Sequence, residues 1–423
     1  MIPAGREERW ALTVTTPETP GAILASRTRP VEPSIGRPGD GMEEVAGMRT
    51  RTGRTRRAGR LVVAVAALAL LAAACSSTSS GGTGGSGSGN KIALLLPESK
   101  TTRYEAQDRP LFEAKVKALC SDCQILYSNA NQDPAAQQNQ ADAALTNGAK
   151  VLVLDPVDSA SAASIVSKAK ARNVPVISYD RLITGADVDY YISFDNVEVG
   201  KLQARSLDSK LKADGQGSGT IVMINGSPTD NNAKLFKQGA HSVLDSSSLK
   251  IGKQYDTPDW SPDQAQTEME QAITALGTNG FQGVYAANDG TAGGAIAAMR
   301  SQGIDPSTRP VTGQDAELAA VQRILTGQQY MTVYKAIKPE AGQAAELAVD
   351  LVNGNRSAAD SLAKQKTNNG QKDVASIILT PVAVTKANAK QTITQMISDG
   401  FLKTADICSG SAATACQQLG LSQ

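Results

Sequence analysis

The stretch VLVLDPVDSASAASIVSKAKARNVPVISYD, residues 151–180, contains two short apolar runs separated by a helix-forming segment. The runs VLVLDP (151–156) and VPVISYD (174–180) are almost continuously apolar until each meets a carboxylate, which is typical of strands buried on both faces of a parallel sheet. A strand, a helix and a second strand in this order form the repeating unit of α/β sheets. The stretch therefore predicts a parallel sheet covered by helices.

The same alternation continues along the chain on both sides of this stretch. The other runs are KIALLLP (91–97), QILYSN (124–129), YYISFD (190–195), TIVMING (220–226), KIGKQYD (250–256), GVYAAND (283–289), PVTGQD (310–315), YMTVYK (330–335) and ASIILTPVAV (375–384). Eleven strands exceed a single doubly wound unit here, so the pattern favours an α/β fold of two similar lobes. A closed eight-stranded barrel fits less well, because 190–195 follows its predecessor without a helix.

The N-terminal part of the chain is predicted to be a leader covering residues 1–74, with a signal peptide at about 48–74. Six arginines between positions 49 and 60 precede the apolar run LVVAVAALALLAAA (61–74). This run is shorter than the roughly 20 residues of a membrane-spanning helix, and a basic segment before it is typical of a secretory signal. The string LAAAC is similar to a lipobox, so we expect cleavage before Cys75 and lipidation of its thiol. The Ser/Gly-rich residues 75–90 then form a flexible tether, while the choice between Sec and twin-arginine export stays open.

Four further cysteines occur in two close pairs, Cys120 with Cys123 and Cys408 with Cys416. A zinc site needs a second close pair of ligands, which the single histidine, His241, cannot supply. In an exported protein, two local disulfides are the favoured interpretation. A thioredoxin-like redox role for the first pair is the alternative.

Composition excludes several classes of function. The 42 basic and 41 acidic side chains give a formal net charge of +1, which does not attract nucleic acid. One histidine rules out a multi-histidine metal site and disfavours a Ser-His-Asp relay. We therefore expect no metal, no cofactor and no nucleic-acid partner.

Polar residues stand at the ends of most apolar runs, where parallel strands of an open sheet present their ligand-binding edge. These residues are Asp155, Asp180, Arg181, Asp195, Asn196, Asn225, Asn288, Asp289, Gln314, Asp315 and Lys335. Their mixture of donors and acceptors suits a neutral ligand with many hydroxyl groups, because each hydroxyl both donates and accepts. Trp260, which lies in a polar loop, and Tyr104 could supply aromatic faces for such a ligand.

Several segments resemble the D-xylose-binding members of the type 1 periplasmic sugar-binding proteins of ABC transporters, a family that includes ribose and galactose binders. The segments are KIALLLPESKTTRYEAQDR, VISYDRLI, YYISFDNVEVGKLQA, GSPTDNNAKLF, AANDGTAGGAI, TGQDAELA, MTVYKAI and ILTPVAV, within residues 91–403. The resemblance implies two Rossmann-like lobes joined by three hinge crossings. We expect the N-terminal lobe to contain residues 91–196 and 337–377, and the C-terminal lobe residues 197–336 and 378–423.

The resemblance also implies a set of sugar-binding residues, matched motif by motif. They are Arg103, Tyr104, Arg181, Asp230, Asn232, Trp260, Asn288, Asp315 and Lys335. One position departs from the family, because Tyr104 stands where the family usually has tryptophan. The two cysteine pairs are also additions to the family pattern.

The expected function is that of a lipid-anchored, monomeric receptor on the outer face of the cell membrane, which delivers a pentose such as D-xylose to an ABC permease. Three alternatives come from other classes. A carbohydrate-active enzyme could use carboxylates from the set Asp180, Asp230 and Asp315. A sugar-responsive repressor shares the lobes but needs an N-terminal DNA-binding domain, where this chain has a leader. A sensor feeding a chemotaxis or signalling receptor stays open.

Overall fold

The computed structural model describes residues 90–421, so the predicted leader, Cys75 and nearly all of the tether lie outside the described residues. The first of its sheets has seven strands in the order β10-β11-β5-β4-β3-β1-β2. All neighbours in this sheet pair in parallel except β10 with β11. Its strands are β1 (Lys91–Leu96), β2 (Gln124–Asn129), β3 (Val151–Leu154), β4 (Val176–Tyr179), β5 (Tyr190–Phe194), β10 (Gln365–Asn368) and β11 (Asp373–Leu379).

Helices cover both faces of this sheet, which explains why its central strands are continuously apolar. Alternate residues of β1 point to opposite faces, so that Leu94 packs in a cluster with Phe112 and Leu95 in a cluster with Ile165. The helices are α1 (Arg109–Leu119), α2 (Pro134–Thr146), α3 (Ala163–Lys170), α9 (Ile337–Val352) and α10 (Arg356–Leu362). We call this sheet and these helices the first lobe.

The second lobe is built around a three-stranded parallel sheet of order β7-β6-β8 and an antiparallel pair, β12-β9. Val199 and Phe236 pack on one face of the larger sheet, and Met269 and Ala292 pack on the other. Its strands are β6 (Thr220–Asn225), β7 (Lys250–Asp256), β8 (Gly283–Ala286), β9 (Met331–Tyr334) and β12 (Val382–Thr385). Its helices are α4 (Asn196–Ala213), α5 (Asn231–Leu244), α6 (Pro262–Leu276), α7 (Asp289–Ser301) and α8 (Leu318–Leu325).

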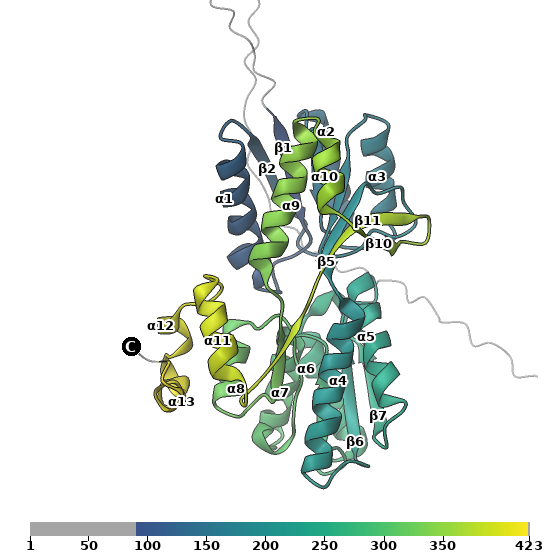
Figure 1. Ribbon diagram of the computed structural model, residues 1–423. Coiled ribbons are helices and arrows are strands. Elements are labelled where there is room, and N and C mark those ends of the chain that lie inside the picture. The colour runs from purple at the N-terminus through teal and green to yellow at the C-terminus, as the bar shows by residue number, and fades with distance from the viewer. Residues whose placement is uncertain (1–89, 422–423) are drawn as a thin grey trace, which may run out of the picture. The chain divides into compact units, whose positions relative to one another are not determined.

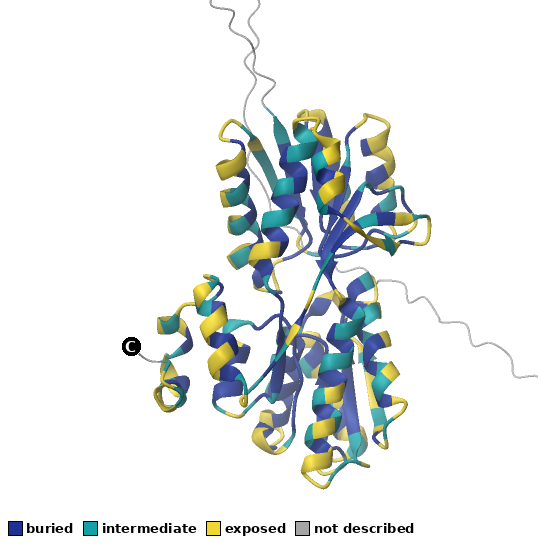
Figure 2. Ribbon diagram, viewed as in Figure 1, coloured by how far each residue is buried: buried dark blue, intermediate teal, exposed yellow. Residues whose placement is uncertain are grey.

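The chain passes between the lobes three times: from β5 to α4, from β9 to α9 and from β11 to β12 (Figure 1). Figure 2 shows that the helix faces turned toward the sheets are buried and that the outer faces are exposed. The carboxyl ends of the strands in both lobes face the region where the chain crosses, which places the polar strand ends near one another.

Two strand predictions were wrong. Residues 375–384 do not form one strand, because β11 ends at Leu379 in the first lobe and β12 begins at Val382 in the second. Residues 310–315 do not form a strand; a single bridge joins Val311 to Val284. The chain there turns at once toward the cavity described below. Strand β10 was not predicted, since its sequence QKTN is polar and lies at a sheet edge.

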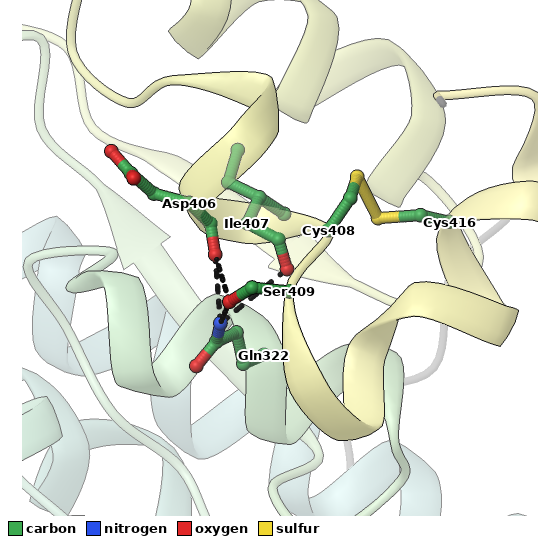
Figure 3. Close-up of a disulfide and its surroundings, with 6 residues drawn as sticks. All are labelled: Gln322, Asp406, Ile407, Cys408, Ser409 and Cys416. Carbon is green, nitrogen blue, oxygen red and sulfur yellow. Dashed lines mark hydrogen bonds between the residues drawn. A yellow bond between two sulfur atoms is a disulfide. The ribbon is translucent and has the colours of Figure 1, made fainter. Parts of the chain in front are cut away.

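The C-terminal segment follows β12 and contains α11 (Ala389–Ser398), α12 (Thr404–Ile407), the turn η4 (Gly410–Ala412) and α13 (Ala413–Leu419). Nε2 of Gln322 in α8 donates to the carbonyl of Asp406 (2.9 Å) and to Oγ of Ser409 (3.1 Å), as Figure 3 shows. The disulfide Cys408–Cys416 ties α12 to α13, and a second disulfide, Cys120–Cys123, closes the turn after α1. The segment is therefore fastened to the second lobe through α8.

Candidate functional site

A small cavity lies between the two lobes, at the carboxyl ends of their strands, with a free volume of about 20 Å³. This volume holds about one water molecule and is far below the roughly 300–1,000 Å³ of sites for drug-sized ligands, so a larger ligand can enter only when the lining groups move apart. The lining residues are Thr101, Tyr104, Asp180, Arg181, Asp230, Asn232, Phe236, Trp260, Asn288, Gln314, Asp315 and Lys335. Eight of the nine predicted ligand-binding residues are in this set, and Arg103 is not.

Tyr104 stands at the start of η1 (Tyr104–Asp108), a single π-helical turn that precedes α1. Its hydroxyl donates to Oδ2 of Asp180 (2.9 Å), which follows β4. The guanidinium carbons of Arg103 and Arg181 lie 5.3 and 5.6 Å from the centre of the ring, within the range of cation–π attraction. Because both arginines and the hydroxyl contact fix this ring, Tyr104 presents a rigid aromatic surface to the cavity.

Arg103 lies behind the cavity wall rather than in it. Its guanidinium makes two hydrogen bonds to Asp108, of 2.9 and 2.6 Å, and a third to Glu340 of 2.7 Å. Nη1 donates to Oδ1 of Asp180 at 3.3 Å. With its donors directed at these three carboxylates, Arg103 supports Asp180 from outside the set of lining residues, and its own role in ligand binding stays a prediction.

Arg181 is one of the charged residues that connect the first lobe to the second. Nε of Arg181 is 3.1 Å from Oδ2 of Asp230, and it lies 3.6 Å from Asp155. Nη2 is 3.6 Å from Glu98. All four side chains are buried, so this ion cluster is screened little by solvent. Burial raises the pKa of Asp155 strongly, although Arg181 opposes this shift.

Asp180, Lys335 and Asp315 form a second charged group across the cavity. Nζ of Lys335 is 3.1 Å from Oδ1 of Asp315 and 3.8 Å from Oδ1 of Asp180. Burial opposes ionisation of Asp180, but the charges of Arg103, Lys335 and Arg181 outweigh it and hold the pKa of this carboxyl below its usual range. Burial likewise tends to lower the pKa of Lys335, and here the two aspartates outweigh it and raise the pKa. Asp180 is therefore a carboxylate and Lys335 a cation at neutral pH.

Trp260 forms the aromatic wall of the second lobe. Its Nε1 donates to Oδ2 of Asp230 (3.0 Å), and its ring meets that of Phe236 edge to face at 6.3 Å. The ring lies so close to Gly226 that a Cβ there would be 1.9 Å from the indole. Glycine at the end of β6 is therefore what leaves room for the tryptophan.

Helix N-termini hold the other polar residues of the second lobe. Asp230 caps α5 by accepting from the backbone nitrogen of Asn232 (2.8 Å), and Asn288 caps α7 by accepting from that of Thr291 (2.8 Å). Nδ2 of Asn232 donates across the lobes to the carbonyl of Asp180 (3.0 Å). Burial and the charge of Asp180 raise the pKa of Asp230, while Arg181 and the hydrogen bonds from Asn232 and Trp260 oppose this shift.

The arrangement suits recognition of hydroxyl groups. Oε1 of Gln314 is a buried acceptor without a hydrogen-bond partner among the described residues, whereas the only partner of Oδ1 of Asp315 within 3.5 Å is the ammonium group of Lys335; both residues line the cavity. Buried acceptors of this kind call for a donor, which a ligand hydroxyl can be. Within residues 90–421, no cluster of His, Cys, Asp and Glu is arranged to hold a metal ion.

Four lining residues were absent from the predicted ligand set: Thr101, Asp180, Phe236 and Gln314. Asp180 and Gln314 did carry a signal, since both stand among the polar ends of the apolar runs. Phe236 looked like a core residue because it lies on the apolar face of a helix. Thr101 carried no signal beyond its position after the first strand.

Comparison with known proteins gives a consistent result. Residues 92–356 match the periplasmic binding protein domain family. The D-xylose-binding periplasmic proteins of Escherichia coli K12 and Haemophilus influenzae are 40% and 38% identical to this chain, over 75% and 74% of it and 92% and 90% of their own lengths. A solute-binding protein of an ABC transporter from Clostridium phytofermentans, solved with β-D-glucose, has a TM-score of 0.67 at 28% identity and covers 75% of this chain and 100% of its own.

Two α/β lobes with parallel sheets, three crossings between them and a polar cavity at the strand ends define the type 1 periplasmic binding protein fold. The chain belongs to the periplasmic binding protein family, and the relatives named above are sugar-binding and solute-binding proteins of transport systems. Among the helices of residues 90–421, none is sufficiently long and apolar to span a membrane.

Proposed function

We propose that this protein binds a single monosaccharide, D-xylose or a related pentose, in the cavity between its lobes. The observation that carries the proposal is a small buried cavity lined by two aromatic rings, those of Tyr104 and Trp260, together with buried charged and amide groups that include the unpaired Oε1 of Gln314. Sugar rings pack their C–H faces on aromatic rings and direct their hydroxyls at such polar groups. The D-xylose-binding relatives at 40% and 38% identity support the choice of sugar.

In this proposal the protein performs no reaction and needs no cofactor. Its work is a hinge motion, in which the lobes, joined between β5 and α4, between β9 and α9 and between β11 and β12, close over the sugar because the closed form makes the tighter contacts. The predicted division at 377/378 would cut β11, which continues to Leu379. It then acts as a monomer that delivers the sugar to an ABC permease.

Isothermal titration of the mature chain, residues 75–423, tests the ligand. The panel is D-xylose, ribose, arabinose, galactose and glucose, and we expect D-xylose to bind tightest. His241→Ala is a matched control in α5, because this side chain contacts Asp245 and Gln254 on the surface, away from the cavity. Failure of all five sugars to bind would overturn the proposal, and tight binding of a hexose alone would overturn the pentose assignment.

The lipid anchor is a separate part of the proposal and rests on LAAAC at residues 71–75. We expect the protein expressed with its leader to enter the detergent phase of a Triton X-114 separation and the Cys75→Ala variant to remain in the aqueous phase. Equal partitioning of the two proteins would contradict lipidation at Cys75 without affecting the sugar site.

A further inference from the structure

Asp315 sits in a turn whose backbone is strained. Asp315 and Ala316 have positive φ angles of 95° and 52°, which residues other than glycine adopt uncommonly; aspartate adopts them more readily than most, and alanine does not. Such a conformation persists only where neighbouring groups hold it, and it is concentrated at functional sites. The turn follows Gln314, and it directs both Gln314 and Asp315 into the cavity.

A second carboxylate, that of Asp289, lies behind this turn. Oδ2 of Asp289 accepts from the backbone nitrogen of Glu317 (3.0 Å), and the backbone nitrogen of Asp289 donates to the carbonyl of Gln314 (3.0 Å). Asp289 thus holds the backbone on both sides of Asp315. Its side chain is 1% exposed and does not line the cavity.

Thr332 of β9 completes the contact. Its hydroxyl donates to the Asp289 carboxylate, with distances of 2.9 and 2.8 Å to the two oxygens, and accepts from the backbone nitrogen of Ala316 (3.2 Å). Nε2 of Gln329 donates to Oδ1 of Asp289 at 2.7 Å. The pair therefore bonds directly to Ala316 and to the residues on either side of the turn, Gln314 and Glu317, while Asp315 itself donates its backbone nitrogen to the carbonyl of Val333, next to Thr332 (2.9 Å).

The backbone also fits closely around Asp289, which supports a role for this carboxylate in holding the turn. A Cβ at Gly313 would lie 2.0 Å from Oδ1 of Asp289, so glycine is needed there for the carboxylate to reach the turn. Burial and the nearby Glu317 raise the pKa of Asp289, which means that a carboxylate at this position is costly. An apolar residue would avoid that cost, but it could not accept the hydrogen bonds that hold the turn.

We infer that Asp289 and Thr332 are positioning residues for ligand binding: they hold the turn at 314–316 in the conformation that aims Asp315 at the ligand and at Lys335. The inference rests on the proposed function for its binding measurements. It assigns a role to a buried pair that touches no ligand.

The test measures D-xylose affinity by titration for Asp289→Asn, Thr332→Val and Thr332→Ser. Asn keeps the shape of Asp289 but replaces one acceptor oxygen by a donor, and Val removes the hydroxyl of Thr332. We expect the dissociation constant to rise about 10- to 100-fold in both, and Thr332→Ser to stay within about threefold of wild type. Asp305→Asn is the control, because Asp305 also accepts from a backbone nitrogen in the second lobe but lies on the surface.

A double-mutant cycle separates positioning from a general structural role. If Asp289 acts through Asp315, then Asp289→Asn combined with Asp315→Ala should bind no more weakly than Asp315→Ala alone. Additive losses, or unchanged affinity in Asp289→Asn and Thr332→Val, would overturn the inference. If Asp289→Asn does not fold, the comparison of Thr332→Val with Thr332→Ser provides the same test.

A crystal structure of Thr332→Val decides the inference without any sugar. We expect Asp315 and Ala316 to leave the left-handed region, and an unchanged turn would overturn the inference. Wild-type protein that binds none of the five sugars would overturn the proposed function instead, so the two failures are distinguishable.

Discussion

The first lobe holds its cavity side chains chiefly by charge, whereas the second lobe combines ion pairs of Lys335 and Asp230 with helix caps and backbone hydrogen bonds. In the first lobe, Arg103 and Arg181 are surrounded by buried carboxylates, which are Glu98, Asp108, Asp155, Asp180 and Glu340. In the second lobe, Asp230 and Asn288 cap α5 and α7, and the Asp315 turn is fastened by Asp289. The lobes thus face the same cavity with different supports.

The difference has an energetic consequence. Removing one partner from a buried ion cluster leaves uncompensated charge, which destabilises the fold itself. Removing a side chain held by a cap or a turn mainly removes its contact with the ligand. Substitutions in the first lobe should therefore reduce stability and binding together, while those in the second lobe should reduce binding with a smaller loss of stability.

The largest effect is expected for Arg181→Met, which leaves Asp230, Asp155 and Glu98 without their shared cation. We expect the free energy of unfolding in urea to fall by about 3–5 kcal/mol and sugar binding to disappear. Arg205→Met is the control, since the Arg205–Glu198 pair is exposed and should contribute less than about 1 kcal/mol. Equal stability of the two variants would contradict the charge-held description of the first lobe.

Trp260→Ala should weaken sugar binding by about 2–4 kcal/mol, because it removes a buried ring that is the second lobe's aromatic wall. Gly226→Ala should act in the same direction by displacing the indole. Titration calorimetry measures both. Trp10 lies in the predicted leader, so the mature chain has Trp260 alone and its fluorescence should change on sugar binding. A Trp260→Ala variant with wild-type affinity would mean that the cavity is not the sugar site.

Removing the C-terminal disulfide tests whether a cross-link outside the cavity affects sugar binding. Replacing both Cys408 and Cys416 by Ser should reduce the free energy of unfolding by at most roughly 2–3 kcal/mol, as expected for a short loop, and leave sugar affinity within about twofold. Urea unfolding and titration provide these values. Mass spectrometry of non-reduced peptides checks the pairing itself, and free thiols in exported protein would refute it.

The smallest effect concerns Glu317, a half-buried carboxyl of the second lobe that accepts from the backbone nitrogen of Thr102 in the first (3.2 Å). Burial and the charge of Asp315 raise the pKa of Glu317 to about 7. Between pH 4.5 and about 7, the Glu317 carboxyl is therefore protonated in the folded chain but ionised in the unfolded chain. Its contribution to the free energy of unfolding is complete below pH 4.5 and is lost as the pH rises through 7.

Glu317→Gln should remove this contribution. The variant's free energy of unfolding, relative to wild type, should increase by on the order of 1 kcal/mol between pH 5 and pH 8. Glu346→Gln, at the exposed pair with Lys115, is the control. Parallel stability profiles for Glu317→Gln and wild type would contradict the assignment.

The sequence by itself determined the fold class, because apolar runs alternating with helical segments have only a few ways to bury their faces. It also indicated much of the cavity: six residues at run ends, Asp180, Arg181, Asn288, Gln314, Asp315 and Lys335, all line it. The same signal failed for Asp155, Asp195, Asn196, Asn225 and Asp289, which stand at equivalent positions but do not line the cavity. Strand ends mark where a ligand can lie, and the loop that follows each strand decides which way the side chain points.

Only the tertiary structure decided which side chains meet. Arg103 matches the family motif, yet Asp108 and Glu340, the latter 237 positions away along the chain, draw its guanidinium behind the cavity wall. Phe236 has the spacing of a core residue, but it meets Trp260 at the cavity because α5 begins there. Asp289 gains its contacts from Glu317 and Thr332 through a turn with left-handed backbone. Local sequence patterns encode how each segment buries its apolar face, whereas hydrogen bonds and ion pairs between segments depend on distances that exist only after the lobes have packed.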